Sequence, residues 1–428
     1  MKLFGTSKVV NNELNIGEVD ATKLIEKYGS PLYVMDEALI RDNCRRYINA
    51  FAKDKNKVAY AGKAFNTLSM CRLVKEEGLC LDVVSGGELF TAYKSEFPLE
   101  NIYFHGNNKT LEEISMGIEL GVGRFVIDNF YEIDKINEIA KTMGKIQKIM
   151  LRITPGIEAH THEYIKTGQE DSKFGFTLLE DQAFKAVEKC ISLSNVELAG
   201  FHCHIGSQIF DVEPFVDEVK IMINIMKDVQ NKYGITLKEL DLGGGFGIYY
   251  TEEDEPKEPE VFCEAILQTA EEVCKEIGFD MPVLIIEPGR SIVANAGTTL
   301  YTVGSIKDVP GIRRYVAVDG GMGDNIRPAL YQAKYECTIA NKMDEDSGQK
   351  VTIAGKCCES GDILINDIEI GNVESGDILA MSTTGAYGFS MANNYNKIPR
   401  PSVVMVKDGE VKIAYKRETY EDLIRNEV

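Results

Sequence analysis

The chain reads Val58-Ala59-Tyr60-Ala61-Gly62-Lys63, a short apolar run that ends in a basic side chain. Seven further apolar runs end in a polar residue or a glycine: Leu81 to Ser85, Ile102 to His105, Arg124 to Asp128, Ile149 to Arg152, Leu198 to His204, Leu240 to Gly243 and Val283 to Glu287. Such runs indicate strands, and most of the segments between them are long enough for a helix. Eight strands alternating with helices predict an α/β fold, a (β/α)8 TIM barrel whose reacting groups gather at the strands' C-terminal ends.

The segment between the third and fourth runs shows the helical pattern. Leu111, Ile114 and Ile118 recur at the spacing of one helix face, and Gly121 is suited to end the helix. Similar segments cover residues 68–78, 129–144, 178–193, 215–233 and 261–278. Strands and helices are therefore expected to alternate throughout this part of the chain.

A β-rich pattern replaces the alternation after Arg290. Its clearest element is a hairpin, because Asp408-Gly409 lies between the apolar runs Val403 to Val406 and Val411 to Tyr415. A chain of 428 residues also exceeds what one hydrophobic core usually organises. We therefore expect two domains, a barrel over residues 32–287 and a β domain from residue 288 to 428.

The composition excludes several classes of protein. A formal net charge of -20 argues against a nucleic-acid partner, since phosphate binding needs clustered positive charge. No apolar run reaches the length of a membrane span, and the N-terminus lacks the pattern of a leader. The ten cysteines lack the dense spacing of a secreted scaffold and fit free thiols. We expect a soluble, cytoplasmic protein.

Lys63 emerges from an apolar strand with small neighbours. Desolvation would disfavour its ammonium form and prepare the amine for covalent bonding to a carbonyl compound. The alternative is an ordinary lysine at a strand end that reaches solvent.

Glycines follow the last two strands of the expected barrel. They are Gly243, Gly244, Gly245 and Gly247 after the seventh strand, and Gly289 beside Arg290 after the eighth. Loops at these two places often bind phosphate in such barrels, because glycines let backbone N–H groups approach the anion. A plain turn is the alternative, but three consecutive glycines would be costly in one.

Glu287 ends the eighth strand inside an apolar run, so its carboxylate needs a specific partner. A protonated ring nitrogen of a cofactor would supply one, and so would a salt bridge to Arg152. His202, Cys203 and His204 resemble metal ligands, but alternation along a strand turns Cys203 away from the two histidines. We expect a core or ring-stacking histidine there, and no metal.

Two polar groups stand out in the β domain. Arg327 and Tyr331 are four residues apart and would share a helix face, where they could bind a substrate carboxylate or form a surface pair. Cys357 and Cys358 are adjacent, so alternation would send one toward the core and the other toward a cleft. Glu359 and Asp362 then suit the wall of a polar cleft.

Together these residues resemble the pyridoxal-phosphate decarboxylases of the alanine-racemase-like fold, the group that includes ornithine decarboxylase. The matching stretches, in chain order and over nearly the whole chain, are Tyr60 to Phe65, Asp82 to Glu88, His105 to Lys109, His202 to Ser207, Gly243 to Gly247, Glu287 to Arg290, Cys358 to Asp362 and Gly385 to Gly388. The resemblance implies a barrel that binds pyridoxal 5′-phosphate. It also implies a C-terminal β-barrel-like domain that residues 1–31 complete.

The resemblance also implies individual roles. Lys63 would hold the cofactor covalently, His204 would stack on its ring, and Glu287 would bind the ring nitrogen. The residues implied for the phosphate or its surroundings are Ser207, Gly244, Gly245, Gly247, Gly289, Arg290 and Tyr387. The family shares each active site between two subunits, so Cys358 and Glu359 are expected to reach into the partner of a homodimer, where Cys358 donates a proton.

The implied substrate is an amino acid, and the run from His160 to Gly168 resembles the family members that act on diaminopimelate. Those members convert meso-2,6-diaminopimelate at its D centre to L-lysine and CO2, the last step of lysine biosynthesis. The residues expected to bind the substrate are Arg290, Arg327, Tyr331, Glu359 and Tyr387. In this assignment, the arginines and Tyr331 take the distal carboxylate and Glu359 takes the distal ammonium.

Three alternatives stay open. The same fold could decarboxylate ornithine, arginine or carboxynorspermidine, or racemise an amino acid. A non-catalytic, cofactor-binding protein could serve a partner protein, although Lys63, Glu287 and Cys358 together argue against it. A metal-dependent barrel hydrolase could use His202 and His204 together with Cys358.

Overall fold

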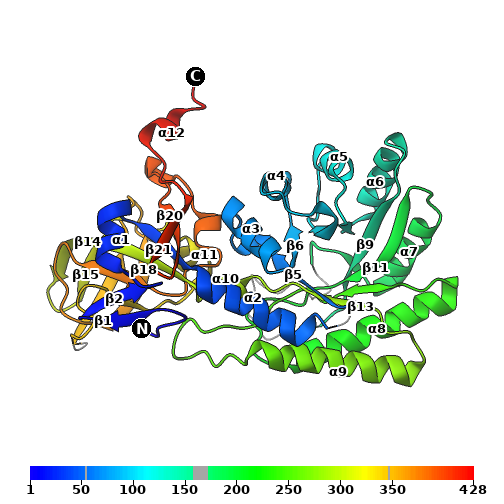
Figure 1. Ribbon diagram of the computed structural model, residues 1–428, viewed down its shortest axis with the longest axis horizontal. Helices are drawn as coiled ribbons and strands as arrows, with labels where there is room; N and C mark the ends of the chain where they lie inside the picture. Colours follow the sequence, from blue (N-terminus) through cyan, green and yellow to red (C-terminus); the bar gives the residue numbers. More distant parts are fainter. Residues whose placement is uncertain (54, 158–171, 346–347) are drawn as a thin grey trace. The chain divides into compact units, whose positions relative to one another are not determined.

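The computed structural model describes residues 1–53, 55–157, 172–345 and 348–428. The chain divides into two compact units (Figure 1). The β-rich unit comprises residues 1–43, 249–255 and 290–428, and the barrel unit comprises residues 44–248 and 256–289. Residues 32–43 thus group with the β-rich unit and not with the expected barrel, because the strand that follows Pro31 pairs inside the β sheet.

The barrel unit contains a closed barrel of eight parallel strands, which confirms the predicted fold. The strands are β5 (Lys57–Ala61), β6 (Cys80–Val83), β7 (Ile102–Phe104), β8 (Arg124–Ile127), β9 (Gln147–Thr154), β11 (Val196–His202), β12 (Glu239–Asp241) and β13 (Val283–Ile286). Neighbours along the chain pair in order, and pairing of β13 with β5 closes the ring. The short β10 (Phe176–Thr177) pairs with β9 outside this ring.

Helices surround the barrel strands in Figure 1. They are α3 (Leu68–Glu76), α4 (Gly86–Lys94), α5 (Leu111–Leu120), α6 (Phe130–Thr142), α7 (Gln182–Ile191), α8 (Glu213–Tyr233) and α9 (Pro259–Ile277). Local sequence explains their ends. Thr110 and Glu113 form a capping box at the start of α5, and Gly121 ends that helix in the left-handed conformation.

The β-rich unit is built on a sheet with strand order β18-β17-β15-β14-β4-β20-β21, to which β16 and β19 add. The strands are β4 (Leu32–Asp36), β14 (Gly297–Val309), β15 (Arg313–Val318), β16 (Cys337–Ile339), β17 (Gln349–Ala354), β18 (Ile363–Ile370), β19 (Ile378–Met381), β20 (Ser402–Lys407) and β21 (Glu410–Tyr415). The N-terminal β4 lies between β14 and β20, so the strand that completes this sheet is Leu32–Asp36, just beyond the segment 1–31 that was expected to do so.

Smaller elements complete this unit. They are β1 (Lys8–Val10), β2 (Glu13–Ile16), β3 (Val19–Asp20), α1 (Ala21–Tyr28), α2 (Glu37–Phe51, which continues into the barrel unit), α10 (Arg290–Val293), α11 (Arg327–Tyr331) and α12 (Tyr420–Ile424). The predicted hairpin is confirmed, because Asp408 and Gly409 have φ angles of 50° and 76° between β20 and β21. Leu14 and Ile16 pack with Leu32, Leu300 and Val404 in one core.

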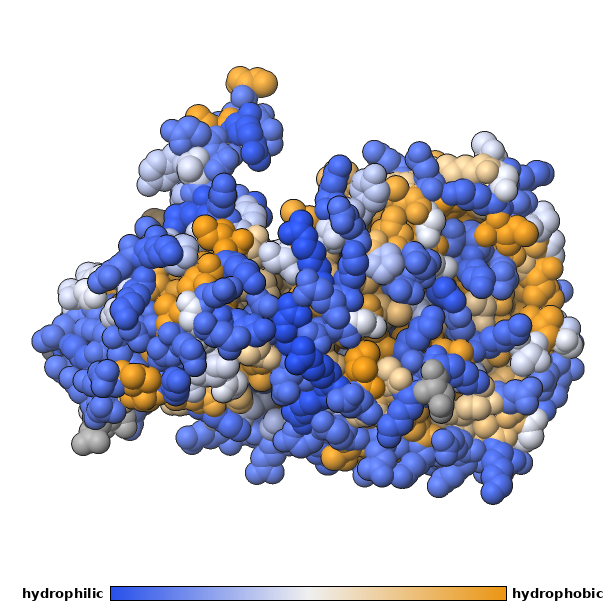
Figure 2. Space-filling view, in the orientation of Figure 1, coloured by the Kyte–Doolittle hydropathy of each residue, from blue (hydrophilic) through white to orange (hydrophobic). Residues whose placement is uncertain are grey.

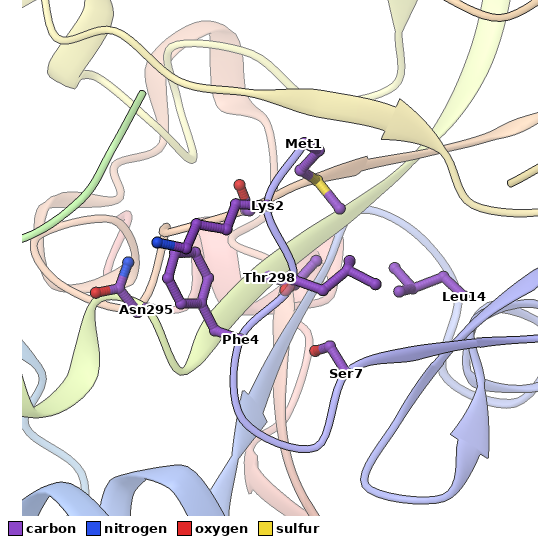
Figure 3. A pocket seen from close by; sticks show the side chains of 9 residues that line it. Met1, Lys2, Phe4, Ser7, Leu14, Asn295 and Thr298 are labelled. Atoms are coloured by element: carbon purple, nitrogen blue, oxygen red, sulfur yellow. The ribbon is translucent and has the colours of Figure 1, made fainter. Parts of the chain in front are cut away.

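The first residues of the chain are held in this unit (Figure 3). The Lys2 amide donates to a Glu336 carboxylate oxygen at 2.9 Å, and the Lys2 ammonium lies 4.4 Å from the centre of the Tyr249 ring. They border a small pocket that contains none of the expected site residues and is lined by Met1, Lys2, Leu3, Phe4, Ser7, Leu14, Asn295, Thr298 and Ser382.

Hydrophilic residues cover most of the face shown in Figure 2, and hydrophobic residues are scattered between them. Among the described helices, none combines the length and the apolar character that a membrane crossing requires.

Candidate active site

A ring of polar side chains lies one step above the apolar interior of the barrel. The interior layer consists of Ala59, Cys80, Tyr103, Val126, Met150, Ala199 and Ile285. Side chains repeat with a period of two along a strand, so the residues two positions further on face the interior again, nearer the C-terminal end. On five of these strands they are Asp82, His105, Asp128, Arg152 and Glu287, all of them buried.

Glu287 contacts two histidines in this ring. His105 Nε2 lies 2.7 Å from Glu287 Oε1, and His202 Nε2 lies 3.3 Å from Glu287 Oε2. All three residues are buried: His105 is 4% exposed, His202 is 1% exposed and Glu287 is 7% exposed. The ion pairs described for Glu287 thus join it to these histidines, whereas the sequence suggested Arg152 as the protein partner.

The charges of the three groups follow from burial and proximity. Burial alone would raise the pKa of Glu287, but His105 and His202 outweigh it and hold that pKa well below its usual value. Burial would lower the pKa of His105, but Asp82 and Glu287 outweigh it and raise that pKa. His202 behaves differently, because burial lowers its pKa to about 3. We infer an ionised Glu287 between a charged His105 and a neutral His202.

Lys63 lies just beyond β5, in a 3-10 turn over Gly62–Ala64, and its side chain is exposed. The expectation that an apolar strand desolvates this amine is therefore wrong, because the strand ends at Ala61 and Lys63, two residues further on, is exposed. His204 follows β11 and is half-buried. Loss of hydration and then the charge of Lys63 lower the pKa of His204 well below its usual value, so its ring is neutral and close to Lys63.

The loop that carries His105 is fixed by a buried ion pair. Lys109 Nζ donates to the carbonyl oxygens of Gly106 at 2.8 Å and Val126 at 2.7 Å, and it lies 3.4 Å from Glu132 Oε1. These contacts join the loop after β7 to the end of β8 and the start of α6. The arrangement holds His105 at the C-terminal end of the barrel strands.

Close packing accounts for the glycines after β12 and β13. A Cβ atom on Gly244 would lie 2.2 Å from the Glu287 carbonyl oxygen, and one on Gly245 would lie 2.3 Å from the Gly206 carbonyl oxygen. Gly289 packs in the same way against Ala61. Close packing against neighbouring residues thus explains why these positions are glycines, whether or not an anion binds there.

The backbone amides of these loops distinguish better between a phosphate-binding site and a plain turn. The Gly243 and Gly247 amides already donate to protein acceptors, each at 2.9 Å. The Gly244 and Gly245 amides have no protein acceptor within the described ranges. Two adjacent amides of this kind suit an anion at the mouth of the barrel.

Two buried arginines meet at one phenol in the β-rich unit. Arg290 Nη1 donates to the Tyr250 hydroxyl at 2.6 Å, and Arg327 Nη1 donates to the same oxygen at 3.0 Å. Arg327 also donates to Tyr335 at 2.5 Å. Burial would raise the pKa of Tyr250, but the two guanidinium groups outweigh it and lower that pKa. Tyr250 and Tyr335 were not predicted, because neither lies in a recognisable motif.

The expected neighbours of these arginines are present in the same unit. Arg327 and Tyr331 lie on the helix α11, but Arg327 is buried, which excludes the surface pair that the spacing also allowed. The Arg290 guanidinium lies 4.9 Å from the centre of the Tyr387 ring.

The segment around Cys358 is exposed, whereas Cys357 is half-buried. The Cys358 amide donates to the Asn396 side chain at 2.8 Å, and Glu359 is exposed. Asp362 does not form a cleft wall as expected. It is buried and accepts the amides of Met322 and Cys357, at 2.6 Å and 2.7 Å, because its carboxylate organises the loop.

Sequence reasoning placed Glu287 and His204 in one region and missed His105 and Tyr250. The signal for His105 was its position at the end of the third strand, two residues beyond an interior residue. The run from His160 to Gly168, which suggested a particular substrate, lies outside the described residues.

Comparison with known proteins identifies the family. The family model described as "Pyridoxal-dependent decarboxylase, pyridoxal binding domain" matches residues 37–294. A diaminopimelate decarboxylase from Bacillus subtilis is 55% identical over 99% of this chain and 98% of its own. The crystal structure of a diaminopimelate decarboxylase from M. jannaschii in complex with L-lysine is 40% identical, with a TM-score of 0.93 over 99% of this chain and 98% of that one.

A second solved structure extends this likeness. A diaminopimelate decarboxylase from Helicobacter pylori, complexed with L-lysine, is 32% identical, with a TM-score of 0.86 over 94% of this chain and 98% of that one. These matches extend over both units, and the barrel carries the residues of the family's pyridoxal-binding domain. The chain therefore belongs to the pyridoxal-dependent decarboxylases and, within them, to the diaminopimelate decarboxylase family.

Proposed function

We propose that this protein is a carboxy-lyase that decarboxylates meso-2,6-diaminopimelate at its D centre, with pyridoxal 5′-phosphate as cofactor, to give L-lysine and CO2. The observation that carries the proposal is the full-length likeness to diaminopimelate decarboxylases, two of which have been solved with L-lysine bound. In a cell this reaction is the last step of lysine biosynthesis, and we place it in the cytoplasm.

The barrel residues fit the cofactor. Gly244 and Gly245 offer two adjacent amides that suit a phosphate, and Glu287 offers a buried, ionised carboxylate that suits a protonated ring nitrogen. Lys63 offers an exposed amine close to the neutral imidazole of His204. We assign Lys63 to the covalent bond with the cofactor, His204 to its ring face and the barrel unit, residues 44–248 and 256–289, to the cofactor-binding domain.

The phosphate needs several donors to balance its charge. We assign to it, or to its immediate surroundings, Ser207, Gly244, Gly245, Gly247, Gly289, Arg290 and Tyr387. For Gly247 the assignment is to the loop and not to its amide, because that amide already donates to the Ile209 carbonyl oxygen.

Arg327 is the residue best suited to a distal carboxylate of the substrate. It is a buried cation whose described partners are the phenols of Tyr250 and Tyr335, so a carboxylate would add the anionic partner that a buried guanidinium favours. We assign Arg290, Arg327, Tyr331 and Tyr387 to the carboxylates of the substrate and Glu359 to its distal ammonium.

Cys358 is proposed as the proton donor, and the donor comes from the partner subunit of a homodimer. Its exposure is consistent with a side chain that acts outside its own subunit. The adjacent Cys357 is less suited, because burial raises the pKa of its thiol to about 11 and its amide is tied to Asp362.

The residues act in sequence around the reacting carbon. Arg327 and Glu359 orient meso-diaminopimelate so that its D centre faces Lys63. When bound, pyridoxal phosphate supplies an electron sink for the electron pair that remains when the carboxylate leaves as CO2. Glu287 keeps a proton on the ring nitrogen, and Cys358 then donates a proton to the carbon that lost CO2. The untouched L centre makes the product L-lysine.

A substrate panel tests this proposal. The purified protein with pyridoxal phosphate is incubated separately with meso-diaminopimelate, L-ornithine, L-arginine and carboxynorspermidine, and amine products are quantified. We expect lysine from meso-diaminopimelate and no product from the other three. Turnover of a different compound in place of meso-diaminopimelate would overturn the substrate, and no turnover of any would overturn the activity.

A further inference from the structure

We propose that His105 and His202 are positioning residues that clamp the two carboxylate oxygens of Glu287, one imidazole on each oxygen, and so keep the cofactor's ring nitrogen protonated. The inference rests on the proposed function and deepens it. It concerns two side chains that do not touch the reacting carbon and that act through Glu287.

The geometry of the clamp comes from three separate strands. His105 follows β7, His202 ends β11 and Glu287 follows β13, so barrel closure alone brings them together. His105 Nε2 lies 2.7 Å from Glu287 Oε1, and His202 Nε2 lies 3.3 Å from Glu287 Oε2. The two imidazole rings meet edge to face, with centroids 4.8 Å apart. Each ring thus restricts the orientation of the other as well as that of the carboxylate.

The two histidines contribute differently. The His105 ring also lies 3.8 Å from Asp82 Oδ1, so carboxylates on two sides favour its charged form. His202 Nδ1 has no hydrogen-bond partner among the described residues, which suits a neutral ring that keeps its single proton on Nε2 and donates it to Glu287. His105 therefore supplies a charge 2.7 Å from one carboxylate oxygen, whereas His202 supplies a hydrogen bond to the other.

Other ionisable groups face the clamp from neighbouring strands. Asp82 on β6 and Asp241 on β12 are acidic; burial raises the pKa of both, and the charge of His105 opposes that rise at Asp82. Arg152 on β9 and Lys63 beyond β5 are basic and act electrostatically on Asp82. The charged pair that best explains the geometry is therefore His105 with Glu287, and this pair is neutral overall before the cofactor's ring nitrogen adds its proton.

A metal site is a weaker interpretation of the same three side chains, His105, His202 and Glu287. Their ligand atoms lie within 4.8 Å of one another. The His105 Nε2 and Glu287 Oε1 atoms, however, lie only 2.7 Å apart, in direct contact with each other. Two atoms that share a zinc ion at about 2.0–2.2 Å each in tetrahedral geometry would lie more than about 3 Å apart.

The test compares two glutamine variants of the loaded enzyme. His105→Gln keeps a donor but removes the charge, and His202→Gln keeps both neutrality and a donor, so it is the matched control. With cofactor labelled with ¹⁵N in its ring, we expect the nitrogen signal of His105→Gln to move toward that of an unprotonated pyridine. The signal of His202→Gln should stay at the wild-type position. Turnover should fall at least about 10-fold in His105→Gln, with KM within about 3-fold, because substrate contacts are unchanged.

Circular dichroism and cofactor stoichiometry confirm that each variant is folded and loaded. A wild-type ring-nitrogen signal in folded, loaded His105→Gln would overturn the proposal, and so would equal shifts in both variants. If His105→Gln does not load, the wild-type enzyme decides: its ring nitrogen must stay protonated between pH 6 and 9, and deprotonation there would overturn the clamp. Absence of lysine formation by the wild type would overturn the proposed function and leave the nitrogen signal as the test of the clamp.

Discussion

Lys63 lies beyond its strand and is exposed, so its proposed reactivity comes from its neighbours and not from burial in an apolar strand. The neutral ring of His204 lies close to Lys63. The charge of Lys63 also acts on Asp82. An accessible amine beside a neutral ring suits covalent attachment of a carbonyl compound that also needs a stacking partner.

Replacing Lys63 tests this assignment. Lys63→Ala should lose the absorbance band of the lysine-bound cofactor and lower kcat by roughly 10³-fold, because the covalent attachment point is gone. Lys57→Ala, at the N-terminal start of the same strand, should keep both. Absorbance spectra recorded after desalting make the comparison. Survival of the band in Lys63→Ala would remove this lysine from the role.

The phenol shared by Arg290 and Arg327 leads to a second prediction. Tyr250→Phe removes the common acceptor of both guanidinium groups, so we expect KM for meso-diaminopimelate to rise about 10-fold, equal to about 1.4 kcal/mol. Tyr335→Phe, which removes a contact to Arg327 alone, should have a smaller effect. Steady-state kinetics measure both. An unchanged KM in Tyr250→Phe would exclude this tyrosine from holding the substrate arginines.

At the scale of elements, the packing of α8 on the barrel buries a carboxylic acid. Glu218 on α8 is fully buried, and this burial raises its pKa to about 8, since neither of its carboxylate oxygens has a hydrogen-bond partner among the described residues. The folded pKa therefore lies above the value of 4.5 expected in an unfolded chain. Folding binds a proton between these two values, so stability falls as the pH rises from about 4.5 to 8.

Glu218→Gln should remove this dependence. Between pH 5 and 8 the wild type should lose about 2 kcal/mol or more of unfolding free energy relative to Glu218→Gln, because the glutamine cannot ionise. Glu271→Gln, an exposed position on α9, should follow the wild type. Urea unfolding at several pH values measures the difference. Parallel curves for the wild type and Glu218→Gln would show that Glu218 ionises without cost.

Strands and helices were predictable where an apolar pattern was not interrupted by glycines or by a change of unit. Each of the eight apolar runs overlaps one barrel strand, because buried parallel strands are nearly continuous in apolar residues. Helix α4 was not predicted, because it begins with Gly86-Gly87, which reads as a loop. Helix α2 was also missed, although Ile40, Cys44, Tyr47 and Phe51 are buried on one face, because it follows a strand of the other unit.

The site was predictable only in part for a similar reason. Glu287 was recognised from its apolar run, but its partners were not, since His105 and His202 are far from it in sequence and meet it only when the barrel closes. The exposure of Lys63 could not be foreseen either, because it depends on the residue at which β5 ends.

At the scale of the whole molecule, the proposed homodimer with shared active sites predicts that two inactive variants rescue each other. Lys63→Ala and Cys358→Ala should each be inactive, yet a mixture allowed to exchange subunits should recover about a quarter of wild-type activity. Random pairing makes half of the dimers mixed, and each mixed dimer has one intact site. Co-purification of differently tagged subunits confirms exchange. Exchange without recovered activity would show that Lys63 and Cys358 do not act across the subunit interface.

The most direct test of the central claim is the structure of the product formed in D2O. Meso-diaminopimelate is converted by the loaded enzyme, and the lysine is analysed by chiral chromatography and NMR. Loss of CO2 from the D centre predicts L-lysine with a single deuterium on Cε, because the proton donor equilibrates with solvent. D-lysine, or lysine with deuterium on Cα, would contradict the claim.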